Sequence, residues 1–282
     1  MQIEFLGTSG PLTVPKPFCN CKVCIQAREK GIPYSRSGPS VFVHGPDVLI
    51  DTPEEIKDEL NRSRVKKINA CFYSHWHPDH VMGRRLWESK FNLRQWPLRI
   101  DRTDVYLPQR VGETFRDTLG TWDHLKYFEK MGLIRLVELS DGDTVQIGDT
   151  NIKPFRLAED YVYAFLFENS GKRVLIAMDE LLKWDPPAEL HGLDLAVLPM
   201  GIIEFDLFNG ERRIPENHPI LKGEATFQQT LKVIRSLNAS QVIIYHIEDE
   251  ISYDDLKKAE IFLKDQGYGN ITFAYDTMIV NV

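Results

Sequence analysis

The chain has 282 residues, a formal net charge of −7, and 43% hydrophobic and 27% charged residues. These proportions are ordinary for a globular protein, and no apolar run approaches the roughly 20 residues that span a bilayer, so the composition argues against a membrane protein. Acidic and basic residues are interspersed, which argues against a nucleic-acid-binding protein, because such proteins need a basic face. The segment from Met1 to Phe5 resembles a strand rather than a signal peptide, so we expect a cytoplasmic protein.

Short apolar or alternating runs, many bounded by Gly, Pro, Asn or Asp, predict many strands and fewer helices. Strands are expected near 2–7, 40–44, 47–51, 69–74, 104–107, 133–139, 151–156, 161–168, 173–178, 194–198, 241–246 and 271–275. Helices are expected near 53–62, 81–90, 111–130, 224–237 and 252–266. This order predicts an α/β or α+β fold, and the lack of any linker-like stretch predicts one domain over 1–282.

The most informative segment follows the expected strand at 69–74. It reads Ser-His-Trp-His-Pro-Asp-His and contains His75, His77, Asp79 and His80. Side chains of a strand alternate with period two, so His75 and His77 are expected on the same side. Imidazole nitrogens and carboxylate oxygens are ligands that zinc and similar ions prefer. The spacing therefore predicts a metal site.

This histidine motif resembles the signature of the metallo-β-lactamase superfamily of hydrolases. Similar landmarks are Phe5–Gly10, Leu49–Thr52, Ile176–Asp179 and Val242–His246, so the resemblance covers almost the whole chain. It implies a four-layer αββα sandwich and a site for two metal ions. It also implies that Asp51 orients a ligating histidine rather than binding metal itself. The implied ligands are His75 and His77 for the first ion, Asp79, His80 and His246 for the second, and Asp179 as the bridge.

One family ligand is missing from the first site. Ala158 occupies the position where the resemblance places a third histidine. Three alternatives remain open: Glu159 or Asp160 replaces the imidazole and favours manganese or iron over zinc, the first site is weak and one ion remains, or hydrolytic activity is lost.

A second metal site is predicted from the cysteines. Cys19, Cys21 and Cys24 form a C-x-C-x-x-C cluster, which in an intracellular chain more often binds metal than forms a disulfide. Within the superfamily this cluster resembles the PhnP group, the phosphoribosyl cyclic phosphodiesterases, and implies a structural zinc in a loop at about 17–26. A histidine that completes that zinc site in the group is replaced here by Asp249, which is therefore the candidate fourth ligand. The cofactor-biosynthesis protein PqqB has a similar cluster.

The PhnP resemblance also implies a role for His218, because an Asn-His pair at this place supplies a histidine over the phosphate. We therefore expect a metal-dependent phosphodiesterase in which a metal-bound hydroxide attacks a small anionic phosphodiester, either cyclic or open. Asp79 would hold the nucleophile and His218 would assist the leaving group. The alternatives are a thioester or carboxyl-ester hydrolase and a non-catalytic, PqqB-like carrier. The oligomeric state, including a homodimer, is left open.

Residues 84–122 are rich in Arg and Trp. Most of them, including Trp96 and Arg99, are expected to belong to an aromatic-rich helix that packs on the sheet and has a solvated basic face. Arg84 and Arg85 lie one turn beyond the histidine motif and are the candidates there for a phosphate contact.

Overall fold

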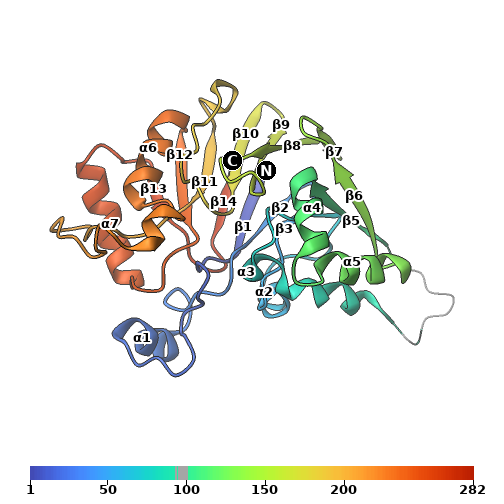
Figure 1. Ribbon diagram of the computed structural model, residues 1–282, viewed down its shortest axis with the longest axis horizontal. Helices are drawn as coiled ribbons and strands as arrows, with labels where there is room; N and C mark the ends of the chain where they lie inside the picture. Colours follow the sequence, from blue (N-terminus) through green and yellow to red (C-terminus); the bar gives the residue numbers. More distant parts are fainter. Residues whose placement is uncertain (93, 95–100) are drawn as a thin grey trace.

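The computed structural model describes residues 1–92, 94 and 101–282, and its main feature is a pair of seven-stranded sheets (Figure 1). Trp96 and Arg99 lie outside the described residues. The first sheet has the order β14-β1-β2-β3-β4-β5-β6, antiparallel from β14 to β3 and parallel from β3 to β6. Its strands are β1 Gln2–Gly7, β2 Ser40–His44, β3 Val48–Ile50, β4 Ala70–Phe72, β5 Thr103–Pro108, β6 Ile134–Leu139 and β14 Ile279–Asn281.

The second sheet repeats this mixed pattern. Its order is β13-β12-β11-β10-β9-β8-β7, antiparallel from β7 to β10 and parallel from β10 to β13. Its strands are β7 Val145–Ile147, β8 Thr150–Arg156, β9 Tyr163–Asn169, β10 Lys172–Ala177, β11 Leu195–Pro199, β12 Gln241–Tyr245 and β13 Ile271–Phe273. Each sheet therefore has a parallel half in which several strands end at the same edge.

Helices contact both sheets. α2 Ile56–Arg62, α4 Gln109–Asp117 and α5 Thr121–Lys130 contact the first sheet, and α6 Phe227–Leu237 and α7 Tyr253–Asp265 contact the second. The sheets pack against each other through aromatic rings, such as Phe72 of β4 and Phe165 of β9, whose ring centroids are 5.3 Å apart. This arrangement confirms the predicted αββα class. The shorter helices are α3 Pro78–Val81 and the 3₁₀ segments η1 Met82–Lys90, η2 Ala188–Leu190 and η3 Pro219–Lys222.

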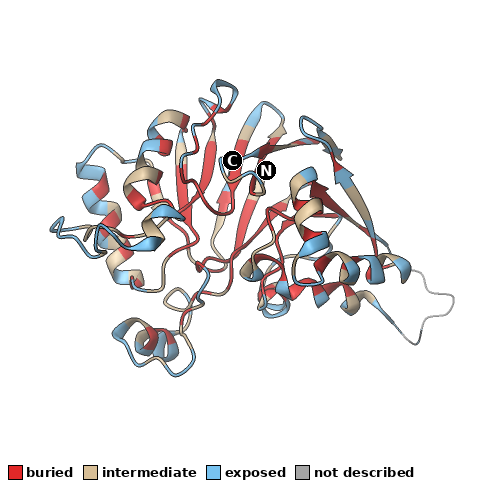
Figure 2. Cartoon of the chain, in the orientation of Figure 1, coloured by how far each residue is buried: buried red, intermediate tan, exposed pale blue. Residues whose placement is uncertain are grey.

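Two apolar clusters hold the layers together. One includes Phe5, Phe72 and Phe165 from both sheets, and the other joins the outer face of the second sheet to Phe227 of α6 and Leu256 of α7. Figure 2 shows the buried residues concentrated in the strands and on the inner faces of the helices. Because both clusters are continuous, the strand ends that carry polar residues are held by packed apolar layers.

Some elements differ from the sequence-based expectations. The helix expected at 111–130 is two helices, because Leu119 and Gly120 adopt left-handed backbone angles of φ 53° and 59° that end α4 and start α5. The helix expected at 81–90 is mostly 3₁₀. Gly83 lies so close to the carbonyl of Pro53 that an added Cβ would sit 1.8 Å from its oxygen. β7, β14 and α1 Lys22–Lys30 were not predicted.

The carboxyl ends of the parallel strands face one region. β3, β4, β10 and β12 are followed directly by Asp51, the histidine motif, Asp179 and His246. Open α/β sheets bind ligands at this edge. No described helix is long and apolar enough to cross a membrane.

Candidate metal centre and active-site cavity

Asp51 organises the loop that carries the histidine motif. Its carboxylate is fully buried and accepts hydrogen bonds from the backbone N–H of Ser74 at 2.7 Å and the Ser74 hydroxyl at 2.6 Å. It also lies 2.7 Å from Nδ1 of His80. With Nδ1 engaged, Nε2 of His80 is left to face the cavity. These contacts are those that an orienting residue would make, and this role of Asp51 stays a prediction.

The first group of convergent side chains comes from β4 and β10. Nε2 of His75 lies 3.4 Å from a carboxylate oxygen of Asp179, and Nδ1 of His77 lies 3.9 Å from the same oxygen. The hydroxyl of Ser74 lies 3.0 Å from Nδ1 of His75, so Nε2 of the same ring is the nitrogen that faces Asp179. These three residues form one potential metal-binding group.

The second group adds the start of α3 and the end of β12. Nε2 of His80 lies 3.4 Å from the carboxylate of Asp79, and Nε2 of His246 lies 3.6 Å from it. Asp179 lies 3.9 Å from His80 and 3.7 Å from His246, so its carboxylate stands between the two groups. This is the position expected of a bridging ligand.

The donor atoms fit metal ions. Nε2 of His75, His80 and His246 are all buried and have no hydrogen-bond partner. A buried polar atom without a partner costs about 1–3 kcal/mol, and native proteins rarely leave several in one place. A divalent cation would satisfy all three nitrogens and the carboxylates between them, since imidazole and carboxylate are ligands of zinc and manganese.

Burial and charge keep these groups in forms suited to ligation. Burial, followed by the charge of His80, lowers the pKa of His75 to about 4, so its ring is neutral at neutral pH. Burial alone would raise the pKa of Asp79, but the charge of His80 and a hydrogen bond from His246 hold it well below its usual range. Burial would likewise raise the pKa of Asp179, which the charge of His246 lowers. Both aspartates are therefore ionised, as metal ligands need to be.

The first group has no third ligand beyond the bridge among the described residues. Ala158 is exposed in the turn between β8 and β9. Asp160 is paired with Arg110 at 2.7 Å and is directed to the surface. Glu159 is half-buried but joins none of the groups of potential ligands. The structure thus brings six predicted ligands together and leaves both replacement candidates outside.

A cavity of about 330 Å³ opens on this centre. One wall is apolar and is formed by Pro11, Leu12, Leu181, Pro199, Ile202, Ile203, Ile214, Ile220 and Ala225. The predicted ligands His77, Asp79, Asp179 and His246 also line it, together with further carboxyl groups, Gly201 and Thr230. The metal groups are therefore accessible to a small molecule.

Sequence reasoning missed Glu180 and Glu224, two of these carboxylates. Glu180 follows the bridging aspartate and accepts the backbone N–H of Ala225 at 3.2 Å. Burial, with a hydrogen bond to Glu224, raises the pKa of Glu180 to about 9, so this carboxyl holds a proton at neutral pH. Glu248 is a third acidic neighbour, and burial raises its pKa to about 7. The only sequence signal was the acidic residue directly after the strand-ending Asp179.

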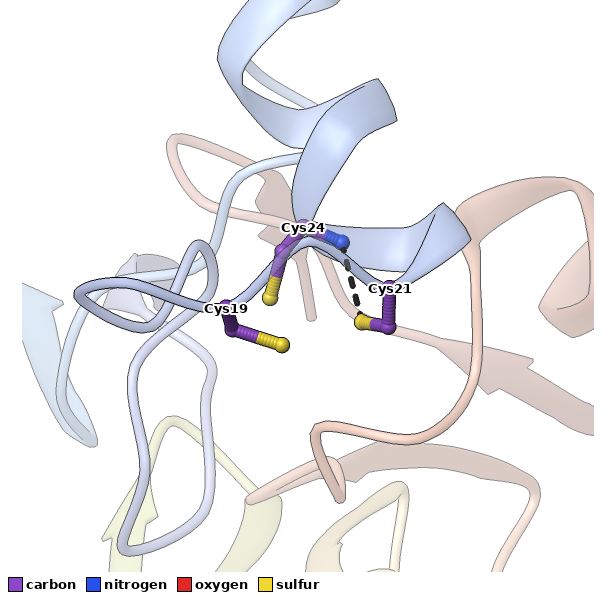
Figure 3. A group of neighbouring side chains, drawn as sticks. All are labelled: Cys19, Cys21 and Cys24. Carbon is purple, nitrogen blue, oxygen red and sulfur yellow. Dashed lines mark hydrogen bonds between the residues drawn. The ribbon is translucent and has the colours of Figure 1, made fainter.

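The cysteine cluster shares no residue with the lining of this cavity. Figure 3 shows the side chains of Cys19, Cys21 and Cys24 directed toward one another. Cys19, Cys21 and Cys24 have sulfur atoms within 4.8 Å of one another, and the N–H of Cys24 donates to the sulfur of Cys21 at 3.5 Å. All three thiols are free. Asp249 is not in this group: its carboxylate forms an ion pair with Lys16 and lines the active-site cavity. The cysteines converge as a metal site requires, with three ligands rather than four among the described residues.

The remaining candidates lie outside the cavity lining. His218 is exposed at the start of η3, where its Nδ1 accepts the N–H of Ile220 at 3.2 Å. Arg84 is buried and donates to the carbonyls of Val81 and Leu119. Arg85 is exposed and paired with Glu88. The two arginines therefore support the local fold and make no contact with the metal groups.

Comparison with known proteins agrees with this geometry. The family model described as a beta-lactamase superfamily domain matches residues 45–247. A diphosphatase of the PhnP family has a similar structure, with a TM-score of 0.72 and 21% identity over 100% of this chain and 97% of the other. Zinc-bound PqqB from Methylobacterium extorquens has a TM-score of 0.68 and 15% identity, and the match covers 100% of both chains. Human short-form tRNase Z has a TM-score of 0.64 and 16% identity, and the match covers 100% of this chain and 99% of the other.

A curated relative shares sequence with part of the chain. This chain is 24% identical to an octanoyltransferase from Porphyromonas gingivalis over 160 residues, which are 56% of this chain. The matched part is 30% of the length of that relative.

Proposed function

Because this chain belongs to the β-lactamase superfamily, whose members are mostly hydrolases, we propose that it is a metal-dependent hydrolase of small phosphodiesters. One observation carries the proposal: three buried imidazole nitrogens without partners converge with Asp79 and Asp179 on an open cavity. The similarity to a PhnP-family diphosphatase and to tRNase Z supports phosphorus as the attacked atom. Zinc or manganese is the proposed ion.

His75 and His77 would hold the first ion, Asp79, His80 and His246 the second, and Asp179 would bridge them. Bound ions would supply Lewis-acid activation of water and of the attacked phosphoryl oxygen. Asp79, held beside His80 and His246, is placed to orient the attacking water by accepting one of its hydrogen bonds. The oxygen of that water would bond to phosphorus and its proton would pass to the solvent, while the bond from phosphorus to the leaving oxygen breaks. An alkoxide leaving group would then take up a proton, for which His218 is the candidate donor.

His218 stays a prediction for protonation of the leaving group. It is exposed, but its neighbour Ile220 lines the cavity, so it lies beside the rim. A loss of activity in His218→Ala for substrates with alkoxide leaving groups, together with normal turnover of p-nitrophenyl esters, would support this role. A nitrophenolate leaves without a proton, so only the poor leaving group needs the acid.

A second candidate is hydrolysis of a carboxyl ester or thioester. The apolar wall of Ile202, Ile203, Ile214 and Ile220 suits an aliphatic acyl chain, and the partial similarity to an octanoyltransferase favours the same substrate class. The same two-group centre can polarise an acyl carbonyl.

Turnover of bis(p-nitrophenyl) phosphate and of p-nitrophenyl octanoate, each with added zinc or manganese, tests the two candidates side by side. We expect hydrolysis of the phosphodiester and its loss in Asp179→Asn, since the bridging position needs an anionic oxygen. Faster hydrolysis of the octanoate would favour the second candidate. No turnover of either would favour a carrier of the same fold, as in the PqqB-like alternative.

A further inference from the structure

The lining of the active-site cavity has an uneven charge. Apart from the predicted metal ligands and the protonated Glu180, it contains the carboxyl groups of Glu224, Glu248, Asp249 and Glu250. Among the described residues that line it, none is Lys or Arg. Ions bound by the predicted ligands can neutralise one reacting anionic group, but nothing described in the rest of the lining offers a positive partner.

Two cations that contact the loop after β12 do not reverse this charge. Lys16 is paired with the carboxylate of Asp249. Arg36 is buried and directs its guanidinium to the carbonyls of Glu248 and Ile251. Both therefore hold the loop after β12 in place, and neither lines the cavity. Glu250 is exposed at the rim and forms no ion pair among the described residues.

The opposite wall is apolar and well supported. Ile203 is buried, and Ile202, Ile214 and Ile220 are half-buried around the cavity. A cavity of about 330 Å³ holds a group of roughly the size of an aromatic ring with a substituent, and each buried CH₂ contributes about 0.8 kcal/mol to binding. The unpartnered Nε2 of His246, which is 5% exposed, faces the same space and marks where the reacting group is held.

From this geometry we infer that the substrate carries a single negative charge, on the group attacked at the metal centre, and that its other part is a compact apolar group that is neutral or positively charged. The inference rests on the proposed function, because it concerns the same cavity and reaction. Polyanionic substrates such as nucleotides with further phosphates, or a nucleic-acid strand, would meet the carboxylates and be repelled.

Three phosphodiesters test this selectivity. Each has a p-nitrophenyl leaving group and a second aryl group with a para methyl, carboxylate or aminomethyl substituent, so size is nearly constant while charge changes. We expect kcat/KM for the carboxylate to be about tenfold below that for the methyl compound, and the aminomethyl compound to equal or exceed the methyl one. Equal kcat/KM values for all three would overturn the inference while leaving the phosphodiesterase proposal intact.

Two variants sharpen the test. Glu250→Lys places a cation at the rim, so the ratio of kcat/KM for the carboxylate compound to kcat/KM for the methyl compound should rise about tenfold. Glu54 is exposed, lies just before α2 and does not line the cavity, so Glu54→Lys should leave this ratio unchanged. Ile214→Asn should lower kcat/KM for the methyl compound more than for a p-nitrophenyl diester whose second group is only methyl. An unchanged ratio in Glu250→Lys, or equal losses in Ile214→Asn, would contradict the inference.

A binding measurement makes the test independent of turnover. Methyl arylphosphonates with the same three substituents carry one charge at phosphorus, and their thermal stabilisation of the zinc-loaded protein should follow the same order. If no diester is hydrolysed but the phosphonates keep this order, the proposed reaction fails and the selectivity stands. If the carboxylate compound stabilises the protein most, the selectivity fails.

Discussion

At the scale of single residues, Asp51 explains how the histidine motif becomes a site. The motif was evident in the sequence, and so were its two partner ligands outside it, Asp179 and His246, because each is a polar residue after an apolar run. The role of Asp51 followed from a resemblance, and the structure adds its contacts with Ser74 and His80. Glu180 and Glu224 could not be predicted, since they are 44 positions apart and only the folded chain brings them together.

Asp51→Asn is expected to weaken metal binding about 10–100-fold, because the amide cannot accept all three hydrogen bonds and leaves His80 free to turn. Competition with a chelator such as 4-(2-pyridylazo)resorcinol measures this affinity. Asp58→Asn, an exposed change on α2, serves as the control and should bind metal normally. Equal affinities in the two variants would show that Asp51 has no orienting role.

At the scale of elements, the sequence predicted helices that are set by apolar periodicity and capping. It missed element boundaries that are set by left-handed backbone turns. The start of α6 is set by a capping box in which Thr226 and Gln229 exchange hydrogen bonds, a pattern that lies inside the expected helix at 224–237. The break between α4 and α5 depends on the left-handed Leu119, which no apolar period reveals. α1 was not predicted, because only Cys24 and Ala27 of this helix are buried and no apolar stripe of helical period marks it.

The segment from Lys16 to Lys30 is the part of the fold whose stability we expect to depend most on a bound metal ion. It packs away from both sheets, and of the residues in α1 only Cys24 and Ala27 are buried (Figure 1). Cys21→Ser is therefore expected to release one zinc ion per chain and to lower the melting temperature by about 5 °C. Turnover should persist, since the cysteines lie outside the cavity lining.

Cys71→Ala provides the matched control for that experiment. Cys71 is fully buried in β4 and belongs to the apolar core, so its loss should lower stability without changing the zinc content. A Cys21→Ser protein with an unchanged zinc content and melting temperature would refute the structural-zinc prediction.

At the scale of the whole molecule, the packing of α2 against the first sheet buries a carboxyl group. Glu59 is 0% exposed, one of its oxygens accepts the hydroxyl of Ser40 at 2.5 Å, and the other has no partner. Burial raises the pKa of Glu59 well above the usual 4.5. The hydrogen bond from Ser40 opposes this shift, and the charge of Asp276 adds to it. The folded protein therefore holds this proton at pH values where the unfolded chain has lost it.

The burial of Glu59 makes the stability of the fold depend on pH in a defined direction. The stability contributed by neutral Glu59 is complete below pH 4.5 and is lost as the pH rises through the pKa of the folded state. Glu59→Gln removes the titration, so its melting temperature relative to the wild type should rise with pH, by about 2–4 °C at pH 8. Glu54→Gln, an exposed change nearby, should follow the wild-type curve. Parallel curves for Glu59→Gln and the wild type would contradict the prediction.

The layered fold as a whole was predictable to its class, because strand runs and the resemblance agreed on an αββα sandwich. The pairing of strands across the two sheets was not, because it depends on contacts such as that between Phe72 and Phe165, which are far apart in sequence. The charge of the cavity could not be predicted either, since its acidic side chains come from the segment after β10, the segment before α6 and the loop after β12.

The most direct test of the account is the metal content of the wild type, Asp179→Asn and Cys21→Ser by elemental mass spectrometry, with hydrolysis of bis(p-nitrophenyl) phosphate measured on the same samples. We predict more than one metal ion per chain in the wild type, a loss of ions and of turnover in Asp179→Asn, and a loss of one zinc with turnover retained in Cys21→Ser. A wild type with a single ion that disappears in Cys21→Ser, and no turnover under added zinc or manganese, would contradict the proposal of a metal-dependent hydrolase.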